Sequence, residues 1–195
     1  MPTGIALHDA RERLFAAAER VLLRDGPSGL TSRAVTEEAD VAKGVLHRYF
    51  ADFDDFLAAL VLDRAARQEA ESAILLGAVG TGSVTGNLTA ALTTLFSPMA
   101  VGMVALITFR DGLRARLRET WPTGVPLATE AMGTIRAYLE GERAAGRLSA
   151  EADTHALALS LVGSGHLLFA DRTGEAPAAQ ATGALVKGVL GGVIR

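Results

Sequence analysis

The chain has 195 residues, of which 49% are apolar, 21% are charged and none is cysteine, and its formal net charge at pH 7 is −3. A chain of this length can form one large domain or two small ones with a substantial core. The lack of cysteine excludes disulfides and thiolate metal sites, and the slightly acidic balance excludes a protein that coats nucleic acid through overall positive charge.

Targeting segments are not expected. Residues 1–7 lack a basic segment followed by a long apolar core, so no signal peptide is predicted. The longest nearly uncharged run near the C-terminus, residues 156–170, is short for a membrane span and is interrupted by glycine and histidine. We therefore expect a cytoplasmic protein that makes no membrane contact.

Apolar residues recur at helical spacing along the chain, and no segment alternates as a strand would, which predicts an all-α protein of nine or ten helices. Stretches that contain glycine and proline at 77–86, 121–126 and 173–177 are predicted loops. The clearest helices are expected over 9–24, 31–39, 42–49, 52–76, 87–96, 100–118, 127–145, 150–170 and 178–194.

The most informative segment, residues 31–57, is predicted to form two short helices joined by a tight turn and followed by a third helix. Thr31 is placed to cap the first helix. Asp40 occupies the turn, where aspartate tolerates a left-handed backbone better than most residues. Leu46 and Phe50, four residues apart, are expected to face the core. This is the pattern of a helix-turn-helix, whose second helix enters the DNA major groove.

The outward face of that second helix carries basic side chains and no acid, which suits a helix that lies in the major groove. Lys43 and Arg48 can meet guanine edges or phosphates, Val45 can contact a thymine methyl, and Gly44 lets DNA approach the backbone. The alternative is an ordinary solvated helix with a few basic residues. The full set predicted to bind DNA is Thr31, Arg33, Lys43, Gly44, Val45, His47, Arg48 and Tyr49.

Residues 31–57 resemble the DNA-binding domain of the tetracycline-repressor (TetR) family of bacterial transcriptional regulators. The upstream helix and the loop at 26–30 fit as well, so the resemblance covers about the first third of the chain. It implies a three-helix helix-turn-helix domain over residues 1–54 and a helical effector-binding and dimerisation domain over residues 55–195. The positions that match the family's signature are Thr31, Arg33, Ala39, Val41, Gly44, Leu46, Tyr49, Phe50 and Leu57.

Four positions depart from that signature. Asp40 stands in place of the usual turn glycine, which the backbone tolerates. Val45 replaces a common serine or threonine, His47 replaces a tyrosine, and Phe53 replaces a lysine that normally meets a phosphate. We expect the last three to remove or weaken contacts with the DNA backbone without changing the fold.

Large apolar residues between the loops at 77–86 and 121–126 are a candidate lining for an effector pocket. Methionine adapts to varied ligand shapes, and tryptophan offers a flat wall. For each residue alone, ordinary core packing is the competing interpretation. This group favours a small apolar or aromatic effector. With one histidine from a later helix, it comprises Phe96, Met99, Met103, Ile107, Phe109, Trp121 and His166.

The helix expected over 150–170 is apolar nearly all round, which requires a cover on both sides. Its small residues Ala158, Ser160, Gly163 and Gly165 permit close helix approach, and the last helix is similarly rich in glycine. This favours a homodimer, in which two helix-turn-helix domains read two half-sites of a palindromic DNA site. The alternative is a central helix buried in a monomer.

No catalytic or metal-binding set converges in the sequence, and no cofactor is predicted. Ser164, His166 and Asp171 lack the strand-turn-helix elbow of a hydrolase. His155 and His166 lack the further ligands of a metal site. Three arginines spaced four residues apart within 110–118 are predicted to form a solvated helix face.

Together these patterns predict a ligand-responsive transcriptional regulator and not an enzyme. The regulator would be a repressor that a small effector releases from a palindromic operator, because effector binding favours a state in which the recognition helices no longer match successive major grooves. The alternative is a helical small-molecule-binding protein with a degenerate, weak DNA-binding head, which Val45 and Phe53 favour.

Overall fold

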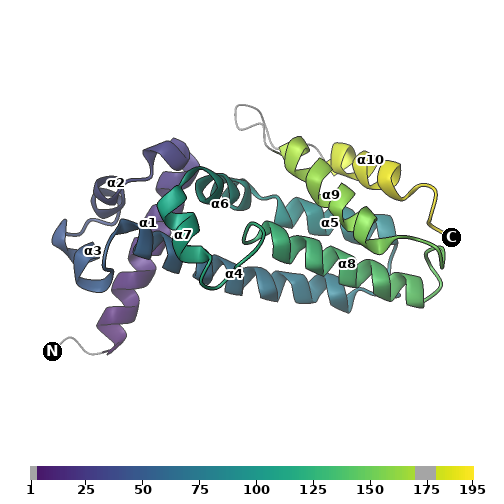
Figure 1. Ribbon diagram of the computed structural model, residues 1–195, viewed down its shortest axis with the longest axis horizontal. Coiled ribbons are helices and arrows are strands. Elements are labelled where there is room, and N and C mark those ends of the chain that lie inside the picture. The colour runs from purple at the N-terminus through teal and green to yellow at the C-terminus, as the bar shows by residue number, and fades with distance from the viewer. Residues whose placement is uncertain (1–3, 170–178) are drawn as a thin grey trace. The chain divides into compact units, whose positions relative to one another are not determined.

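The structure is a computed structural model that describes residues 4–169 and 179–195. Within these residues the chain forms ten α-helices, and the only extended pairing is an isolated bridge between Leu148 and Ile194 (Figure 1). The predicted all-α class and helix count are therefore confirmed. The helices are α1 (Gly4–Gly29), α2 (Ser32–Glu38), α3 (Gly44–Tyr49), α4 (Phe53–Gly77), α5 (Val84–Leu95), α6 (Pro98–Phe109), α7 (Asp111–Leu117), α8 (Ala128–Ala144), α9 (Thr154–Phe169) and α10 (Ala179–Leu190).

The chain divides into two compact units. Unit 1 comprises Met1–Arg64 and Gly102–Thr123, and unit 2 comprises Ala65–Val101 and Gly124–Arg195. Unit 1 therefore contains α1, α2, α3 and α7, and unit 2 contains α5, α8, α9 and α10. Helices α4 and α6 each run from one unit into the other.

Unit 1 is built around α1, which packs against α2. Val35 on α2 and Leu46 on α3 are fully buried. An aromatic cluster joins α1, the end of α3 and α4, because the ring of Phe56 lies 5.6 Å from that of Phe15 and 5.1 Å from that of Phe50. Two short helices that could not persist alone are thereby held on a common core.

In unit 2, helices pack against one another around an apolar core. Helix α8 packs against α9, and α10 packs against both α5 and α9. Each of these four helices contributes a fully buried side chain, namely Leu88, Ile135, Leu161 and Val186, and α4 adds Leu75. The apolar periodicity that predicted these helices is the pattern that this core requires.

Several predicted helix boundaries differ from the structure: α1 and α5 begin earlier than expected, at Gly4 and Val84, and α10 ends earlier, at Leu190. Two further errors have a local cause. The single helix expected over 100–118 is broken into α6 and α7 at Arg110, whose backbone is extended (φ −117°, ψ 96°). The helix expected from residue 150 begins at Thr154, because Asp153 Oδ1 accepts hydrogen bonds from two N–H groups of its first turn (3.0 and 3.1 Å).

The loop predicted over 173–177 and the side chain of Asp171 lie outside the described residues. Within residues 4–169 and 179–195, no single helix is long and apolar enough to cross a bilayer. Helices α5 and α6 reach that length only as a pair bent by 58°.

Candidate DNA-binding surface and effector pocket

The turn between α2 and α3 is built by backbone hydrogen bonds and one left-handed residue. Thr31 caps α2, because its Oγ1 accepts a hydrogen bond from a first-turn N–H group (3.1 Å). Asp40 has a φ of 52°, and the N–H groups of Asp40 and Val41 donate to the carbonyls of Glu37 and Thr36 (3.1 and 3.0 Å). This is a Schellman arrangement with aspartate where glycine is commoner. The predicted left-handed turn at Asp40 is confirmed.

The turn presents α3 with its apolar side inward and its basic side outward. Leu46 is fully buried and Phe50 is 7% exposed, as predicted. Lys43, His47 and Arg48 are exposed, and no side-chain hydrogen bond or ion pair joins them to another described residue. Their side chains are therefore available to a binding partner.

The other residues predicted to bind DNA surround this basic face. Gly44 begins α3, and a Cβ added there would meet no atom within 4 Å. Val45 and Tyr49 are half-buried. Arg33 is exposed, but its Nε donates to Glu37 Oε1 at 2.7 Å, so an acid on its own helix offsets its charge. The eight predicted residues thus share the α2–α3 segment, and its unpaired positive charge lies on α3.

Two arginines of α1 hold α2 in place. Arg20 Nε and Arg24 Nη1 each donate to a different oxygen of Glu38, both at 2.7 Å. The hydrogen bonds from Arg24 and Arg20 lower the pKa of Glu38, and the hydrogen bonds to Asp25 and Glu38 raise the pKa of Arg24. Helix α2 is therefore held partly by a charge-assisted hydrogen-bond network at the protein surface.

Phe53, which stands where the family's signature has lysine, packs within unit 1. Its ring stacks on Phe56 with centroids 5.6 Å apart, and the guanidinium carbon of Arg110 lies 5.0 Å from the centroid of the Phe53 ring. Phe53 thus provides an apolar and cation-π contact, in a position where lysine would offer a charge. The sequence did not predict this contact, because Arg110 is distant in the chain.

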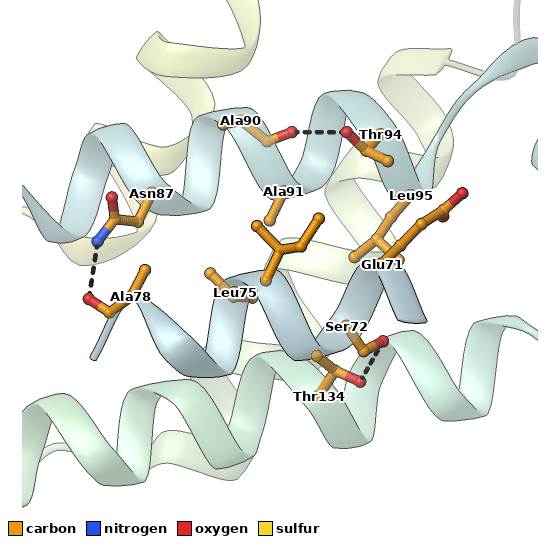
Figure 2. A pocket seen from close by; sticks show the side chains of 11 residues that line it. Glu71, Ser72, Leu75, Ala78, Asn87, Ala90, Ala91, Thr94, Leu95 and Thr134 are labelled. Atoms are coloured by element: carbon orange, nitrogen blue, oxygen red, sulfur yellow. Dashed lines mark hydrogen bonds between the residues drawn. The ribbon is translucent and has the colours of Figure 1, made fainter. Parts of the chain in front are cut away.

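A pocket of about 190 Å³ lies in unit 2 between α4, α5 and α8 (Figure 2). Figure 2 shows Ala91 and Leu95 on the side of α5 that faces Leu75 of α4. The surface of the pocket is mostly apolar. Its lining residues are Glu71, Ser72, Ile74, Leu75, Ala78, Asn87, Ala90, Ala91, Thr94, Leu95 and Thr134.

Most polar side chains of this wall are already hydrogen-bonded within the chain. Thr134 Oγ1 donates to Ser72 Oγ at 3.0 Å, and Asn87 Nδ2 donates to the hydroxyl of Tyr138 at 3.0 Å. Thr94 Oγ1 donates to a backbone carbonyl one turn earlier at 3.3 Å. The pocket therefore offers a ligand mainly carbon atoms, and shape decides what fits it.

None of the seven residues predicted to bind an effector lines this pocket. Phe96 is 8% exposed in the core of unit 2, with its ring centroid 6.4 Å from that of His166, whereas Phe109 is 85% exposed. The effector-binding role of the seven stays a prediction, and they are divided between the units: Phe96, Met99 and His166 lie in unit 2, and Met103, Ile107, Phe109 and Trp121 lie in unit 1.

Large apolar side chains in the sequence did not point to most of these pocket residues. A pocket between helices also needs small residues that leave space, here Ala78 on α4 with Ala90 and Ala91 on α5. Such alanines are common in helices because of their high helix propensity. They signal a pocket only once α4 and α5 are known to be neighbours.

Comparison with known proteins agrees with this architecture. A family model described as "Bacterial regulatory proteins, tetR family" matches residues 14–60, which extend from α1 into α4. No curated protein matches the sequence significantly.

Several solved structures share the fold. A TetR-family transcriptional regulator from Mesorhizobium loti MAFF303099 is 15% identical, with 96% of this chain and 98% of that chain covered and a TM-score of 0.70. A TetR-family regulator from Agrobacterium tumefaciens is 16% identical, with 96% and 99% covered and a TM-score of 0.73. The regulator FadR from Bacillus subtilis, in complex with stearoyl-CoA, is 14% identical, with 93% and 98% covered and a TM-score of 0.68. Residues 14–60 therefore match the N-terminal domain of the TetR family, and the chain as a whole shares the fold of TetR-family regulators.

Proposed function

We propose that this protein is a transcriptional repressor that binds a palindromic operator through α3 and releases it when a small effector binds between α4, α5 and α8. The observation that carries the proposal is the exposed basic face of α3, in which Lys43, His47 and Arg48 have no partner among the described residues. An unpaired basic face on a helix held by a buried aromatic cluster is what major-groove recognition requires.

The roles on this face follow from side-chain chemistry. Arg48 and Lys43 bind guanine edges or phosphates, and Gly44 allows close approach of the DNA to the α3 backbone. Thr31 and Arg33 bind the DNA backbone beside α2, and Arg33 must then exchange Glu37 for a phosphate. Because that pair is exposed, breaking it costs little.

The size of the pocket limits the effector. A cavity of about 150 Å³ admits benzene, and drug-sized ligands occupy roughly 300–1,000 Å³. A pocket of about 190 Å³ therefore suits a compact, apolar molecule slightly larger than a single benzene ring. Stearoyl-CoA, the ligand of the Bacillus subtilis neighbour, is far larger, so we do not extend that ligand to this chain.

Helix α4 is the element through which the effector acts on the helix-turn-helix. It begins at Phe53, directly after the α3 segment, and supplies Glu71, Ser72, Leu75 and Ala78 to the pocket. A ligand that binds one position of α4 better than another shifts the population toward that position. By linkage, DNA and effector then weaken each other's binding.

We propose that the regulator acts as a homodimer that pairs through α9 and α10. Leu159 and Leu167 on α9 are 56% and 78% exposed. Small exposed residues between them, Ser160 and Gly163, allow close helix approach. An operator made of two half-sites requires two heads related by a two-fold axis.

The experiment that tests DNA recognition is selection of genomic DNA fragments by the purified protein at near-physiological salt. We expect enrichment of a palindromic site, and we expect a Lys43→Ala, Arg48→Ala double variant to lose at least roughly tenfold in affinity for it. An Arg136→Ala variant on α8 serves as the control, because it removes an exposed positive charge elsewhere in the chain.

Two results would contradict this assignment. If the wild-type protein binds DNA only weakly, with strong salt dependence and no sequence preference, the head is degenerate and the chain is a small-molecule-binding protein. If the double variant binds the selected site as tightly as the wild-type protein, α3 is not the recognition helix.

The effector site is tested with indole and toluene as compact apolar probes and decanoate as a long-chain comparison. We expect indole or toluene to raise the melting temperature and weaken operator binding. An Ala91→Leu variant, which fills the pocket, should keep operator binding and lose the response. An equal response in this variant would place the effector site elsewhere.

A further inference from the structure

The first turn of α4 is held by α7, a helix far from it in sequence. Asp52 and Asp55 cap α4, since Asp52 Oδ1 accepts from the N–H group of Asp55 (2.9 Å) and Asp55 Oδ2 accepts from that of Ala51 (3.0 Å). The remaining oxygens of both carboxylates face Arg116 of α7. Its Nη2 donates to Asp52 Oδ2, and its Nη1 lies 3.8 Å from Asp55 Oδ1. One arginine therefore joins both capping carboxylates to α7.

A second arginine contacts the same turn of α4. Arg110, just before α7, donates from Nε to Asp54 Oδ1 at 2.5 Å, and its guanidinium lies over the ring of Phe53. Gly112 permits this approach, because a Cβ there would collide with the Asp54 carboxylate. The arginines at 110–118 are thus not the uniform solvated face that the sequence predicted.

The position of this contact connects it with DNA recognition. Only Phe50, Ala51 and Asp52 separate the end of α3 from the start of α4. Phe50 is itself packed against Phe56, one turn into α4. A contact that holds the first turn of α4 in place therefore also holds the orientation of α3.

We propose that Arg110 and Arg116 are positioning residues for the recognition helix. They act through Asp52, Asp54 and Asp55, without touching DNA themselves, and hold the α3–α4 junction at the angle that operator binding requires. This inference rests on the proposed function. It adds a support at the C-terminal end of α3, whereas the Arg20, Arg24 and Glu38 network holds the end of α2 before the turn.

The size of the effect follows from exposure. The side chains of the four ion-pairing residues Arg110, Asp54, Arg116 and Asp52 are between 28% and 51% exposed. Exposed pairs of this kind contribute little individually. We therefore expect single variants to have small effects and an Arg110→Gln, Arg116→Gln double variant to bind operator roughly three- to tenfold more weakly, because the three ion pairs of these arginines with Asp52, Asp54 and Asp55 are all removed.

The test compares the double variant with Arg114→Gln, which breaks an ion pair with Asp111 inside α7 and leaves α4 untouched. Affinities are corrected for the active fraction and measured over a range of salt concentrations. A positioning role predicts weaker binding with an unchanged salt slope in the double variant and no change in Arg114→Gln. If the arginines bound phosphates directly, the slope would fall by about one for each phosphate that the variant no longer neutralises.

Two further measurements separate positioning from general destabilisation. Hydrogen exchange should become faster in α3 and the first turn of α4 of the double variant, with α1 and the helices of unit 2 unchanged. Asp54→Arg and Arg110→Asp should each weaken operator binding. The variant that carries both changes should bind operator more tightly than either single variant, because it rebuilds the ion pair with reversed charge.

The outcomes also separate this inference from the proposed function. Hydrogen exchange needs no DNA, so it tests the contact even if no operator is selected. Unchanged exchange in α3, unchanged operator affinity or a reduced salt slope would each overturn the positioning role. Faster exchange in α3 in a protein that selects no operator would leave the α7 contact standing and refute the proposed function.

Discussion

At the scale of single residues, Gly44 is the position of the helix-turn-helix at which folding and DNA binding can be tested separately. It is the first residue of α3, it is exposed, and a Cβ there would meet no atom within 4 Å. The fold therefore does not need glycine at this position. If glycine has a role here, it concerns a molecule that approaches the helix from outside.

We expect Gly44→Ala to separate folding from DNA binding. Alanine is the better helix former by up to about 1 kcal/mol, so the free energy of unfolding should stay the same or rise. Operator affinity should fall roughly tenfold, the equivalent of one specific contact, because the new methyl keeps DNA away from the backbone. Urea unfolding and operator titration measure the two effects. Unchanged affinity would show that the α3 backbone does not approach DNA closely.

Tyr138 is a residue whose ionisation is strongly changed by folding. It is fully buried in unit 2, and burial, with a further contribution from its hydrogen bond to Glu142, raises its pKa to about 12. Its hydroxyl also accepts a hydrogen bond from Asn87 of the pocket wall (3.0 Å). The folded state therefore favours the neutral phenol.

This predicts a loss of stability at high pH. Below pH 10 the phenol is protonated in both states and its contribution is complete. Between about pH 10 and 12 the unfolded chain ionises while the folded protein does not, so roughly 2–3 kcal/mol is lost. Tyr138→Phe should lose less than the wild-type protein over this range, in urea unfolding at pH 9 to 12. Equal losses in both proteins would show that Tyr138 is not the group responsible.

At the scale of elements, α9 has two faces that the sequence could not tell apart. Its small residues were all expected to permit close approach of a partner helix. Ala158 and Gly165 are instead buried in the core of their own unit, whereas Ser160 and Gly163 are exposed. Gly165 lies against the ring of Phe96, which a Cβ would meet at 2.5 Å.

We therefore expect Gly165→Ala to destabilise the protein by about 1–3 kcal/mol, because Phe96 must leave its position against α9. Gly133→Ala on α8 is the matched control, since a Cβ there meets nothing within 4 Å and alanine favours the helix. Thermal and urea unfolding compare the two variants. A Gly165→Ala protein as stable as the control would show that α9 can move away from Phe96 at no cost.

At the scale of the whole molecule, the outward side of α9 is an apolar surface that the described part of the chain leaves without cover. Ala156, Leu159, Gly163 and Leu167 share this side at helical spacing and are all exposed. A second copy of the chain related by a two-fold axis would cover it with the same surface.

A Leu159→Glu, Leu167→Glu variant should be monomeric in light scattering, because like charges would meet across the two-fold axis. It should keep its helical circular dichroism and lose affinity for a full palindrome more than for a half-site. Leu23→Glu, at a leucine on α1 that is 48% exposed, is the control and should leave the oligomeric state unchanged. A dimeric double variant would place the interface elsewhere.

The sequence predicted well those features that depend on neighbouring residues. Thr31 as a helix cap, Asp40 as a left-handed turn, and Leu46 and Phe50 as buried residues follow from rules that act over a few positions. The basic face of α3 was predicted for the same reason. The break at Arg110 was missed, because the partners of that arginine, Asp54 and Phe53, lie on another helix.

By itself the sequence determined the all-α class and the helix-turn-helix, because helical periodicity, capping and turn chemistry are encoded locally. Only the tertiary structure decided which small residues of α9 face the core, where a pocket opens between α4, α5 and α8, and which arginines hold the start of α4. These features depend on contacts between segments far apart in the chain. Many arrangements of helices satisfy the same local pattern, so local rules could not choose among them.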